Sequence, residues 1–193
     1  MATLEFFYDF VSPYSYLATT RVEAIAQRAG ASVRFRPFLL GGVMKATGNH
    51  APLETVPKFQ HMKVDLQRWA RRLGVTLHFP ASFPIPSILA LRTALAAEAQ
   101  GKLVPFTHAV YAAAWVDGRD IASPDVLAEV AGAVGLDGAA LVAAAPEFKA
   151  ALVAQTDEAV RRGAFGAPTL FLGDEMFVGN DRLDFVEEAL RRA

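Results

Sequence analysis

The residues whose types and spacing suggest chemistry form the stretch Ser12-Pro13-Tyr14-Ser15, between a short apolar run and a helical pattern. Two reactive side chains separated by two residues at the start of a helix have the C-x-x-C spacing of thiol–disulfide chemistry. The chain contains no cysteine, so both positions carry hydroxyl groups, and a hydroxyl group cannot close a disulfide. The sequence therefore excludes thiol exchange through the protein's own side chains at this turn.

The segments around this turn predict a β-α-β order. Leu4–Phe10 is apolar on both faces, which is typical of a strand buried between helical layers. Ser12 is the predicted N-cap, and Pro13 the first residue, of a helix that ends at Gly30. Ser32–Phe38 alternates apolar and charged residues and predicts a second strand. Such a connection favours parallel pairing with a right-handed crossover.

The middle of the chain predicts a long loop followed only by helices. Residues 39–57 are rich in glycine and proline and predict an irregular loop of a length that is often functional. An apolar stripe at intervals of three and four residues predicts a helix that ends at Gly74. A proline-rich bend is predicted over residues 78–87. Further helices are predicted over 88–100, 103–115 and 123–134, the last capped by Ser123, and Asp137 is expected to cap another short helix.

The C-terminal part returns to mixed structure. A helix over 147–162 precedes strands at 169–172 and 176–178, which a Gly-Asp turn joins into a hairpin. Asp181 is predicted to cap a last helix that buries Leu183, Val186 and Leu190. The order is therefore βαβ, an all-helical insertion, and αββα.

Composition indicates a globular protein of one domain with an insertion, since 53% of the 193 residues are hydrophobic and 20% are charged. A net charge of −1 argues against nucleic acid as a partner. We see no secretory signal and no apolar run of the ~20 residues that a membrane span needs, so we expect a cytoplasmic protein without a membrane partner. The four histidines lack metal-ligand spacing, and no metal is expected.

Three stretches carry a resemblance to a known family: FYDFVSPYSYLA, FRPFLLGGVMKATGN and GAFGAPTLFLGDEMFVGNDRL. Together they resemble the 2-hydroxychromene-2-carboxylate isomerases and the related kappa-class glutathione transferases over nearly the whole chain. The resemblance implies an α/β fold of the DsbA-like thioredoxin type. Residues 1–42 and 147–193 would form the thioredoxin-like domain and 43–146 the all-helical insertion domain. The Ala167–Pro168 bond would be cis and would face the serine turn.

The resemblance also implies that glutathione supplies the missing thiol and that Ser12 is the catalytic residue. A free thiol has a pKa of about 8.5, and lowering it by about two units requires about 2.7 kcal/mol. A hydroxyl hydrogen bond to a charged acceptor gives roughly 1.5–3 kcal/mol, and a helix N-terminus adds about 0.3–2 kcal/mol. The alternative is that Ser12 is only a helix cap. Ser15 occupies the position of the resolving cysteine, and the alternative is that it is an ordinary first-turn residue of the helix.

Further site residues follow from the resemblance. The backbone of Ala167, before Pro168, should pair with the cysteinyl part of glutathione, and Asn180 and Asp181 should hold its γ-glutamyl end. Asn49 and Lys58 match glutathione-contacting positions, although Lys58 could equally be a solvated lysine.

Three other residues are predicted to contact the substrate, and one aspartate is predicted to have a structural role. Lys45 and His50, in the predicted loop, could bind a substrate carboxylate. Phe83 is a predicted substrate contact where the isomerases would carry tyrosine. Asp9 is expected to bind loop amides and is not assigned to catalysis.

These features predict a glutathione-dependent isomerase that acts on an aromatic ring-cleavage product resembling 2-hydroxychromene-2-carboxylate. A kappa-type transferase, which would release the glutathione adduct, needs the same activated thiol and stays open. A non-catalytic thioredoxin-fold binding module is the alternative from another class. The expected partners are a small aromatic substrate and a second copy of the chain, in a homodimer.

Overall fold

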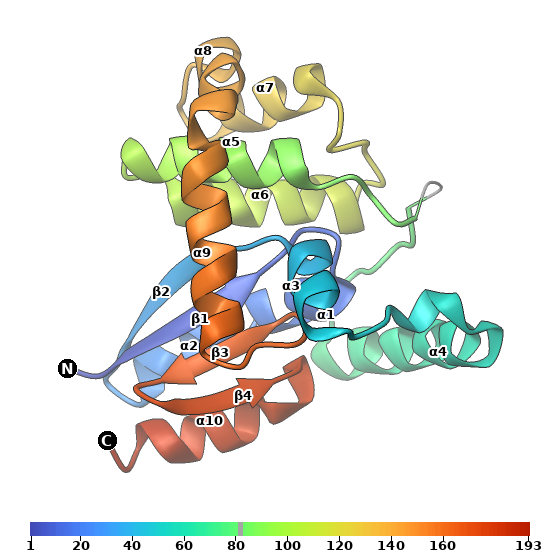
Figure 1. The fold of residues 1–193 in the computed structure, drawn as a ribbon, viewed down its shortest axis with the longest axis vertical. Coiled ribbons are helices and arrows are strands. Elements are labelled where there is room, and N and C mark those ends of the chain that lie inside the picture. Colours follow the sequence, from blue (N-terminus) through green and yellow to red (C-terminus); the bar gives the residue numbers. More distant parts are fainter. Residues whose placement is uncertain (81–82) are drawn as a thin grey trace.

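The computed structural model describes residues 1–80 and 83–193, so residues 81 and 82 of the predicted bend lie outside it. Within this part of the chain, four strands form one sheet in the order β2-β1-β3-β4 (Figure 1). The strands are β1 (Thr3–Tyr8), β2 (Ser32–Pro37), β3 (Thr169–Leu172) and β4 (Glu175–Val178). β1 pairs with β2 in parallel and with β3 in antiparallel fashion, and β3 and β4 form a hairpin. The predicted parallel pairing and hairpin are confirmed.

The two faces of β1 pack against different helices. Phe6 and Tyr8 are fully buried with residues of α1 (Pro13–Thr19), α2 (Val22–Arg28) and α10 (Leu183–Leu190). Phe7 points the other way and is buried with residues of α3 (Leu40–Thr47) and α9 (Lys149–Arg161). Because neighbouring side chains of a strand point to opposite faces, an apolar strand can be covered on both sides. α9 crosses one of these faces in Figure 1.

The helices between the two halves of the sheet agree with the predicted pattern. They are α4 (Val56–Leu73), α5 (Ile88–Ala99), α6 (Leu103–Trp115), α7 (Pro124–Ala133) and α8 (Gly138–Ala144), followed by a 3₁₀ turn at Ala145–Phe148. The predicted caps are confirmed, since Ser123 Oγ accepts from Val126 N at 3.5 Å and Asp137 Oδ1 from Ala140 N at 3.1 Å. Among the described helices, none is both long and apolar enough to cross a membrane. The division into residues 1–42 with 147–193, and 43–146, stays a prediction.

The single helix predicted from Pro13 to Gly30 is wrong, because the chain breaks it into α1 and α2. The Thr19 hydroxyl donates to the Ser15 carbonyl at 2.7 Å, and the Thr20 hydroxyl donates to the Leu17 carbonyl at 2.8 Å. Side-chain hydroxyls that bind the carbonyls of the preceding turn compete with the helical backbone pattern. The break therefore falls at two threonines in succession.

The irregular loop predicted over residues 39–57 is also wrong, because it contains α3 and a 3₁₀ turn at Pro52–Glu54. The two glycines at the start of α3 suggested a loop, but Gly42 allows a close helix contact. A Cβ atom at this position would lie 3.1 Å from Thr156 Cγ2 on α9. Packing of α3 on α9 thus outweighs the low helix propensity of glycine.

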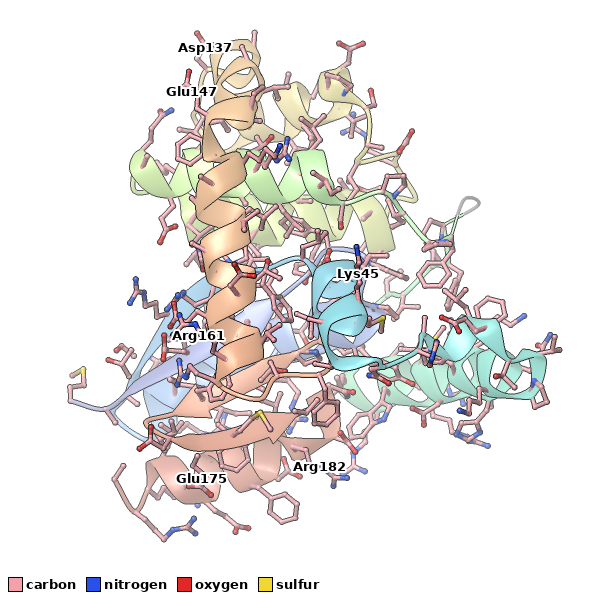
Figure 2. The ribbon with its side chains drawn as sticks, viewed as in Figure 1. Lys45, Asp137, Glu147, Arg161, Glu175 and Arg182 are labelled. Carbon is pink, nitrogen blue, oxygen red and sulfur yellow. The ribbon has the colours of Figure 1, made fainter. Side chains whose placement is uncertain are left out.

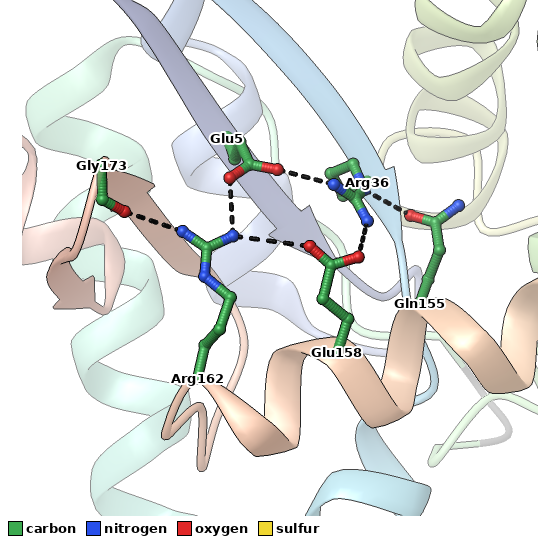
Figure 3. A network of polar contacts seen from close by, with 6 residues as sticks. All are labelled: Glu5, Arg36, Gln155, Glu158, Arg162 and Gly173. Atoms are coloured by element: carbon green, nitrogen blue, oxygen red, sulfur yellow. Dashed lines mark hydrogen bonds and ion pairs between the residues drawn. The ribbon is translucent and has the colours of Figure 1, made fainter.

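A partly buried polar network fixes α9 to the sheet (Figure 3). Arg36 of β2, whose side chain is only 7% exposed, donates to Glu5 at 2.6 Å and to Gln155 at 2.8 Å, and also pairs with Glu158. Arg162 donates to Glu5 at 2.6 Å and to the Gly173 carbonyl at 2.8 Å. These contacts join β1, β2, the β3–β4 turn and α9.

Candidate active site

The Ser12 side chain takes part in two hydrogen bonds at the start of α1. Its Oγ accepts from the Ser15 N–H at 3.2 Å, which confirms the predicted N-cap, and donates to the Ala167 carbonyl at 2.9 Å. Ala167 lies 155 residues away along the chain, so the tertiary fold alone brings the two together. The Ala167–Pro168 bond is cis, as predicted.

Hydrogen bonds within the turn and from side chains of α6 hold the backbone of this turn. The Asp9 carbonyl accepts from Ser12 N and from the Tyr111 hydroxyl, each at 3.0 Å. The Trp115 indole N–H donates to the Phe10 carbonyl at 2.9 Å. The helical insertion therefore helps to fix the conformation in which Ser12 is presented.

The Asp9 side chain is fully buried and binds loop amides, as expected. Its Oδ1 accepts from Val11 N at 3.1 Å, and its Oδ2 accepts from Leu40 N at 2.8 Å. Burial raises the pKa of this carboxyl, and hydrogen bonds from the Ser87 hydroxyl and the two amides partly offset the effect. The carboxylate thus joins the serine turn to the first residue of α3.

Tyr14 lines three neighbouring cavities, and Ser12 lines one of them. We call the first the apolar pocket; it has a volume of about 550 Å³ and is lined by Ser12 and by apolar residues such as Val11, Leu40, Met44, Phe83 and Val178. The polar cleft, of about 420 Å³, is lined by Tyr14, Asp65, Trp69, Ala167, Gly179, Asn180 and Asp181. The lysine cleft, of about 400 Å³, is lined by Tyr14, Pro52, Pro57, Lys58, His61 and Met62.

The cavities can accept an elongated polar molecule beside an apolar one. The Ser12 hydroxyl borders the apolar pocket, and Ala167 lies between that pocket and the polar cleft. Among the described residues that line the apolar pocket there is no aspartate, glutamate, lysine or arginine. A charge that develops next to Ser12 would therefore interact with hydroxyl and amide groups in surroundings of low polarity, where such interactions are strengthened.

Comparison with known proteins gives the family. The sequence pattern of the DSBA-like thioredoxin domain matches residues 3–191. A 2-hydroxychromene-2-carboxylate isomerase of Sphingobium xenophagum is 39% identical over 97% of this chain and 97% of its own length. The chain belongs to the family of these isomerases. A solved structure of a 2-hydroxychromene-2-carboxylate isomerase superposes with a TM-score of 0.88 at 35% identity, covering 98% of this chain and 95% of that one, which confirms the DsbA-like fold.

Two further similarities place this isomerase-family chain near proteins named for glutathione. Human glutathione S-transferase kappa 1 is 29% identical over 97% of this chain and 90% of its own length. The cytosolic disulfide reductase DsbM of Pseudomonas aeruginosa, solved with GSH, has a TM-score of 0.67 and 26% identity, covering 98% of this chain and 99% of that one. Relatives of full length that are named isomerases support an enzyme of the isomerase type.

Asn180 and Asp181 both lie in the polar cleft of this isomerase-family site. Asn180 is 2% exposed, and its Nδ2 has no hydrogen-bond partner within residues 1–80 and 83–193. Asp181 does not cap the last helix, so that prediction is wrong. It lies inside a 3₁₀ turn at Asn180–Arg182 and approaches Arg182 at 3.6 Å, and the N-cap position of α10 belongs to Arg182. Gly179 has a φ of +104°, a backbone conformation that residues with a side chain rarely adopt, so this corner favours glycine.

Three other predicted residues also reach the cavities. Asn49 lines the apolar pocket, but its amide already donates to the Phe165 carbonyl at 2.7 Å and accepts from His50 N at 2.9 Å. Lys58 lines the lysine cleft. Phe83 lines the apolar pocket; its ring stacks on the Phe59 ring at a centroid distance of 6.2 Å and meets the Trp115 ring edge-on at 6.0 Å. Their roles toward ligands stay predictions.

Lys45 projects from α3 in Figure 2 and is not among the described residues that line the three cavities. α3 presents Leu40, Gly41 and Met44 to the apolar pocket, and Lys45 follows Met44 with the rotation of about 100° that separates neighbouring helical residues. His50, which was considered with Lys45, does line the pocket, and its Nδ1 lies 2.9 Å from Glu54 Oε2.

Sequence reasoning missed Tyr14, Asp65 and Trp69. The Tyr14 hydroxyl donates to Asp65 Oδ2 at 3.2 Å, and both residues line the polar cleft with Trp69. Tyr14 stood inside the serine motif itself, which was the available signal. Trp69 lay on the apolar stripe of the predicted helix, and such a stripe does not distinguish a closed core from a cavity wall.

Proposed function

We propose that this protein is a glutathione-dependent isomerase of an aromatic ring-cleavage product that resembles 2-hydroxychromene-2-carboxylate. The observation that carries the proposal is the position of the Ser12 hydroxyl. It borders an apolar pocket and is hydrogen-bonded to the carbonyl of Ala167, which also lines a polar cleft. A hydroxyl at such a junction can activate a thiol held in the cleft against a substrate held in the pocket.

The residues of the clefts fit glutathione. Asn180 offers an amide donor that has no partner within the described chain, and unsatisfied buried donors are rare in folded proteins. We assign Asn180 and Asp181 to the γ-glutamyl end, which carries both an amine and a carboxylate. The backbone of Ala167 would pair with the middle of the tripeptide in the manner of an added strand. Lys58, in the lysine cleft, would attract the carboxylate at the glycine end, and Asn49 would help to shape the neighbouring wall of the apolar pocket.

Bound glutathione would supply a thiolate that adds to a conjugated carbon of the substrate and converts a double bond into a single bond. The substrate would then rotate about this single bond, and elimination of the thiolate would restore the double bond. Ser12 would stabilise the sulfur anion by turning its proton from the Ala167 carbonyl toward the sulfur. Ser12 Oγ accepts a hydrogen bond from the Ser15 N–H. This bond polarises the Ser12 hydroxyl and makes it a stronger hydrogen-bond donor. A hydrogen bond of this kind gives roughly 1.5–3 kcal/mol, which lowers a thiol pKa by roughly one to two units.

The apolar pocket suits an aromatic substrate. Its volume of about 550 Å³ is within the usual range for small-molecule sites. Phe83 and the rings behind it provide an aromatic wall. His50 lines the pocket, and its ring would donate a hydrogen bond to a substrate carboxylate, which is the role that the sequence suggested for Lys45 and His50.

The test is to incubate the protein with glutathione and 2-hydroxychromene-2-carboxylate and to follow the products by mass spectrometry. A product of unchanged mass, formed only with glutathione present, supports the isomerase. A stable glutathione conjugate supports a kappa-type transferase, the second candidate favoured by the similarity to the human kappa enzyme. Absence of both products, together with no binding of glutathione in calorimetry, contradicts the proposal.

A further inference from the structure

One buried carboxylate connects three parts of the molecule next to the candidate site. Asp9 accepts from Val11 in the serine turn and from Leu40 at the start of α3. The Ser87 hydroxyl, from the segment that leads into α5, faces the same carboxylate. The Asp9 backbone carbonyl also accepts hydrogen bonds from Ser12 N and from the Tyr111 hydroxyl. The turn, α3 and the helical insertion therefore meet at this residue.

The arrangement calls for aspartate specifically. Two N–H donors converge on the two oxygens of one side chain, and only a carboxylate offers an acceptor at both positions. Asparagine would place its NH₂ group against one of these N–H groups. Among the described residues, no lysine, arginine or histidine forms an ion pair with Asp9, so the carboxylate does not serve as half of a salt bridge.

The two segments that Asp9 joins are two walls of the apolar pocket. Val11 and Ser12 belong to the turn, whereas Leu40, Gly41 and Met44 belong to α3. Leu39, the N-cap residue of α3, forms no capping bond through its own side chain, and Asp9 accepts from the first helical N–H in its place. The Asp9 carboxylate is thus hydrogen-bonded to both of these walls.

We propose that Asp9 is a positioning residue that fixes α3 relative to the Ser12 turn and so determines how the second substrate meets the glutathione sulfur. The inference rests on the proposed function and adds to it a residue that touches neither ligand. It separates two effects: loss of Asp9 should disturb the electrophile's site, whereas activation of the thiol by Ser12 should persist.

The first test is Asp9→Asn, with Asp157→Asn, an exposed carboxylate of α9, as a control for the change in charge. In Asp9→Asn we expect KM for the electrophile to rise about tenfold, in line with the loss of a hydrogen bond to a charged group. The dissociation constant of glutathione and the ultraviolet titration of its bound thiolate should match those of the wild type. Hydrogen exchange at Leu40 should accelerate in the absence of any ligand. Asp157→Asn should behave as the wild type in all four measurements.

A second variant removes the same hydrogen bond from the other side. Leu40 is the first residue of α3, where proline is tolerated, and Leu39 already has the extended conformation that precedes proline (φ −92°, ψ 103°). Leu40→Pro eliminates the N–H and leaves Asp9 intact, and Leu40→Ala controls for the lost side chain. We expect the electrophile's KM to be about tenfold higher in Leu40→Pro than in Leu40→Ala. This comparison decides the question if Asp9→Asn does not fold.

Three results would overturn the positioning role. They are an unchanged electrophile KM in Asp9→Asn, a thiolate titration in Asp9→Asn shifted as far as in Ser12→Ala, and equal KM values in the two Leu40 variants. Failure of the proposed function has a different signature, since the wild type would then bind no glutathione and show no thiolate absorbance. Even then, hydrogen exchange at the Leu40 amide tests the contact between Asp9 and α3 by itself. An exchange rate in Asp9→Asn equal to that of the wild type would show that Asp9 does not hold α3.

Discussion

At the scale of single residues, Ser12 combines a structural and a chemical role in one oxygen atom. Its Oγ caps α1 by accepting from Ser15 N, and its proton is donated to Ala167 in the free protein. The accepting and donating functions use different parts of the hydroxyl group. The cap can therefore stay in place while the proton turns to a thiolate.

The substitution Ser12→Ala tests the chemical role. The pKa of bound glutathione's thiol should rise by roughly one to two units, because a hydrogen bond of roughly 1.5–3 kcal/mol to the anion is lost. Turnover near neutral pH should fall about 10- to 100-fold and recover in part at alkaline pH. Ultraviolet absorbance of the thiolate in the complex measures the titration directly.

Loss of a helix cap is the confounding effect, and Ser123→Ala provides the matched control. Ser123 caps α7 through the same type of bond, so both variants should lose about 0.5–2 kcal/mol of stability. Only Ser12→Ala should lose turnover. A Ser12→Ala protein with wild-type titration and turnover would show that the serine is only a cap.

Asn180 gives a second prediction at this scale. Its buried Nδ2 has no partner within the described residues, so its removal costs the free protein little hydrogen-bond energy. In Asn180→Ala the dissociation constant of glutathione should rise about tenfold or more, with only a small change in Tm. Calorimetric titration and thermal unfolding measure the two quantities. A large loss of stability with unchanged affinity would make Asn180 a structural residue.

At the scale of elements, the Glu5–Arg36–Glu158–Arg162 network fixes α9 across the sheet (Figure 3). Burial raises the pKa of Glu5, but the hydrogen bond from Arg162 and the charges of Arg162, Arg36 and Arg34 outweigh burial, so the pKa lies below its ordinary value of 4.5. A lowered folded-state pKa means that the ionised carboxylate stabilises the fold. This contribution is fully present above pH 4.5 and is lost as the pH falls through the folded-state value.

The corresponding prediction concerns Glu5→Gln. At neutral pH this variant should be less stable than the wild type by about 1.5–3 kcal/mol, the range for losing hydrogen bonds to a charged group, because Glu5 is partly exposed and Arg36 keeps Glu158 and Gln155 as partners. The difference should shrink as the pH falls below 4.5, because the wild-type carboxyl becomes neutral as well. Urea unfolding between pH 3 and pH 7 measures both curves. Glu188→Gln, at an exposed position of α10, is the control, and a pH-independent gap for Glu5→Gln would contradict the assignment.

At the scale of the whole molecule, apolar side chains are exposed around the mouth of the apolar pocket. Leu53 and Phe165 line the pocket and are 37% and 46% exposed, and nearby Val56 is 72% exposed. Exposed apolar groups of this kind often mark interfaces. The resemblance to dimeric families led us to expect a homodimer, and this surface is compatible with one.

Light scattering at micromolar concentration should therefore give twice the 20.8 kDa mass of the chain. The apparent mass should fall on dilution if the interface is small, since association depends on protomer concentration. A single species of 20.8 kDa at every concentration would contradict the prediction.

The sequence by itself determined the parts of this protein that depend on local patterns. Periodicity predicted the buried strand β1 and most helices, and Ser12, Ser123 and Asp137 were recognisable as caps because capping depends on one side chain and the next few residues. The absence of cysteine excluded disulfide chemistry, and the resemblance of three stretches gave the family, the fold and the cis bond before Pro168.

Only the tertiary structure decided what depends on contacts between distant segments. α3 packs closely on α9 where Gly42 lies against Thr156, and a local pattern could not show this contact. Asp181 lies in a 3₁₀ turn and not at a helix cap because the chain turns at Gly179, whose N–H is bound to the Pro168 carbonyl. The cavities, the place of Tyr14 between them and the position of Lys45 outside them arise from the packing of α3 and α4 beside the turn. Packing of this kind leaves no periodic trace in the sequence.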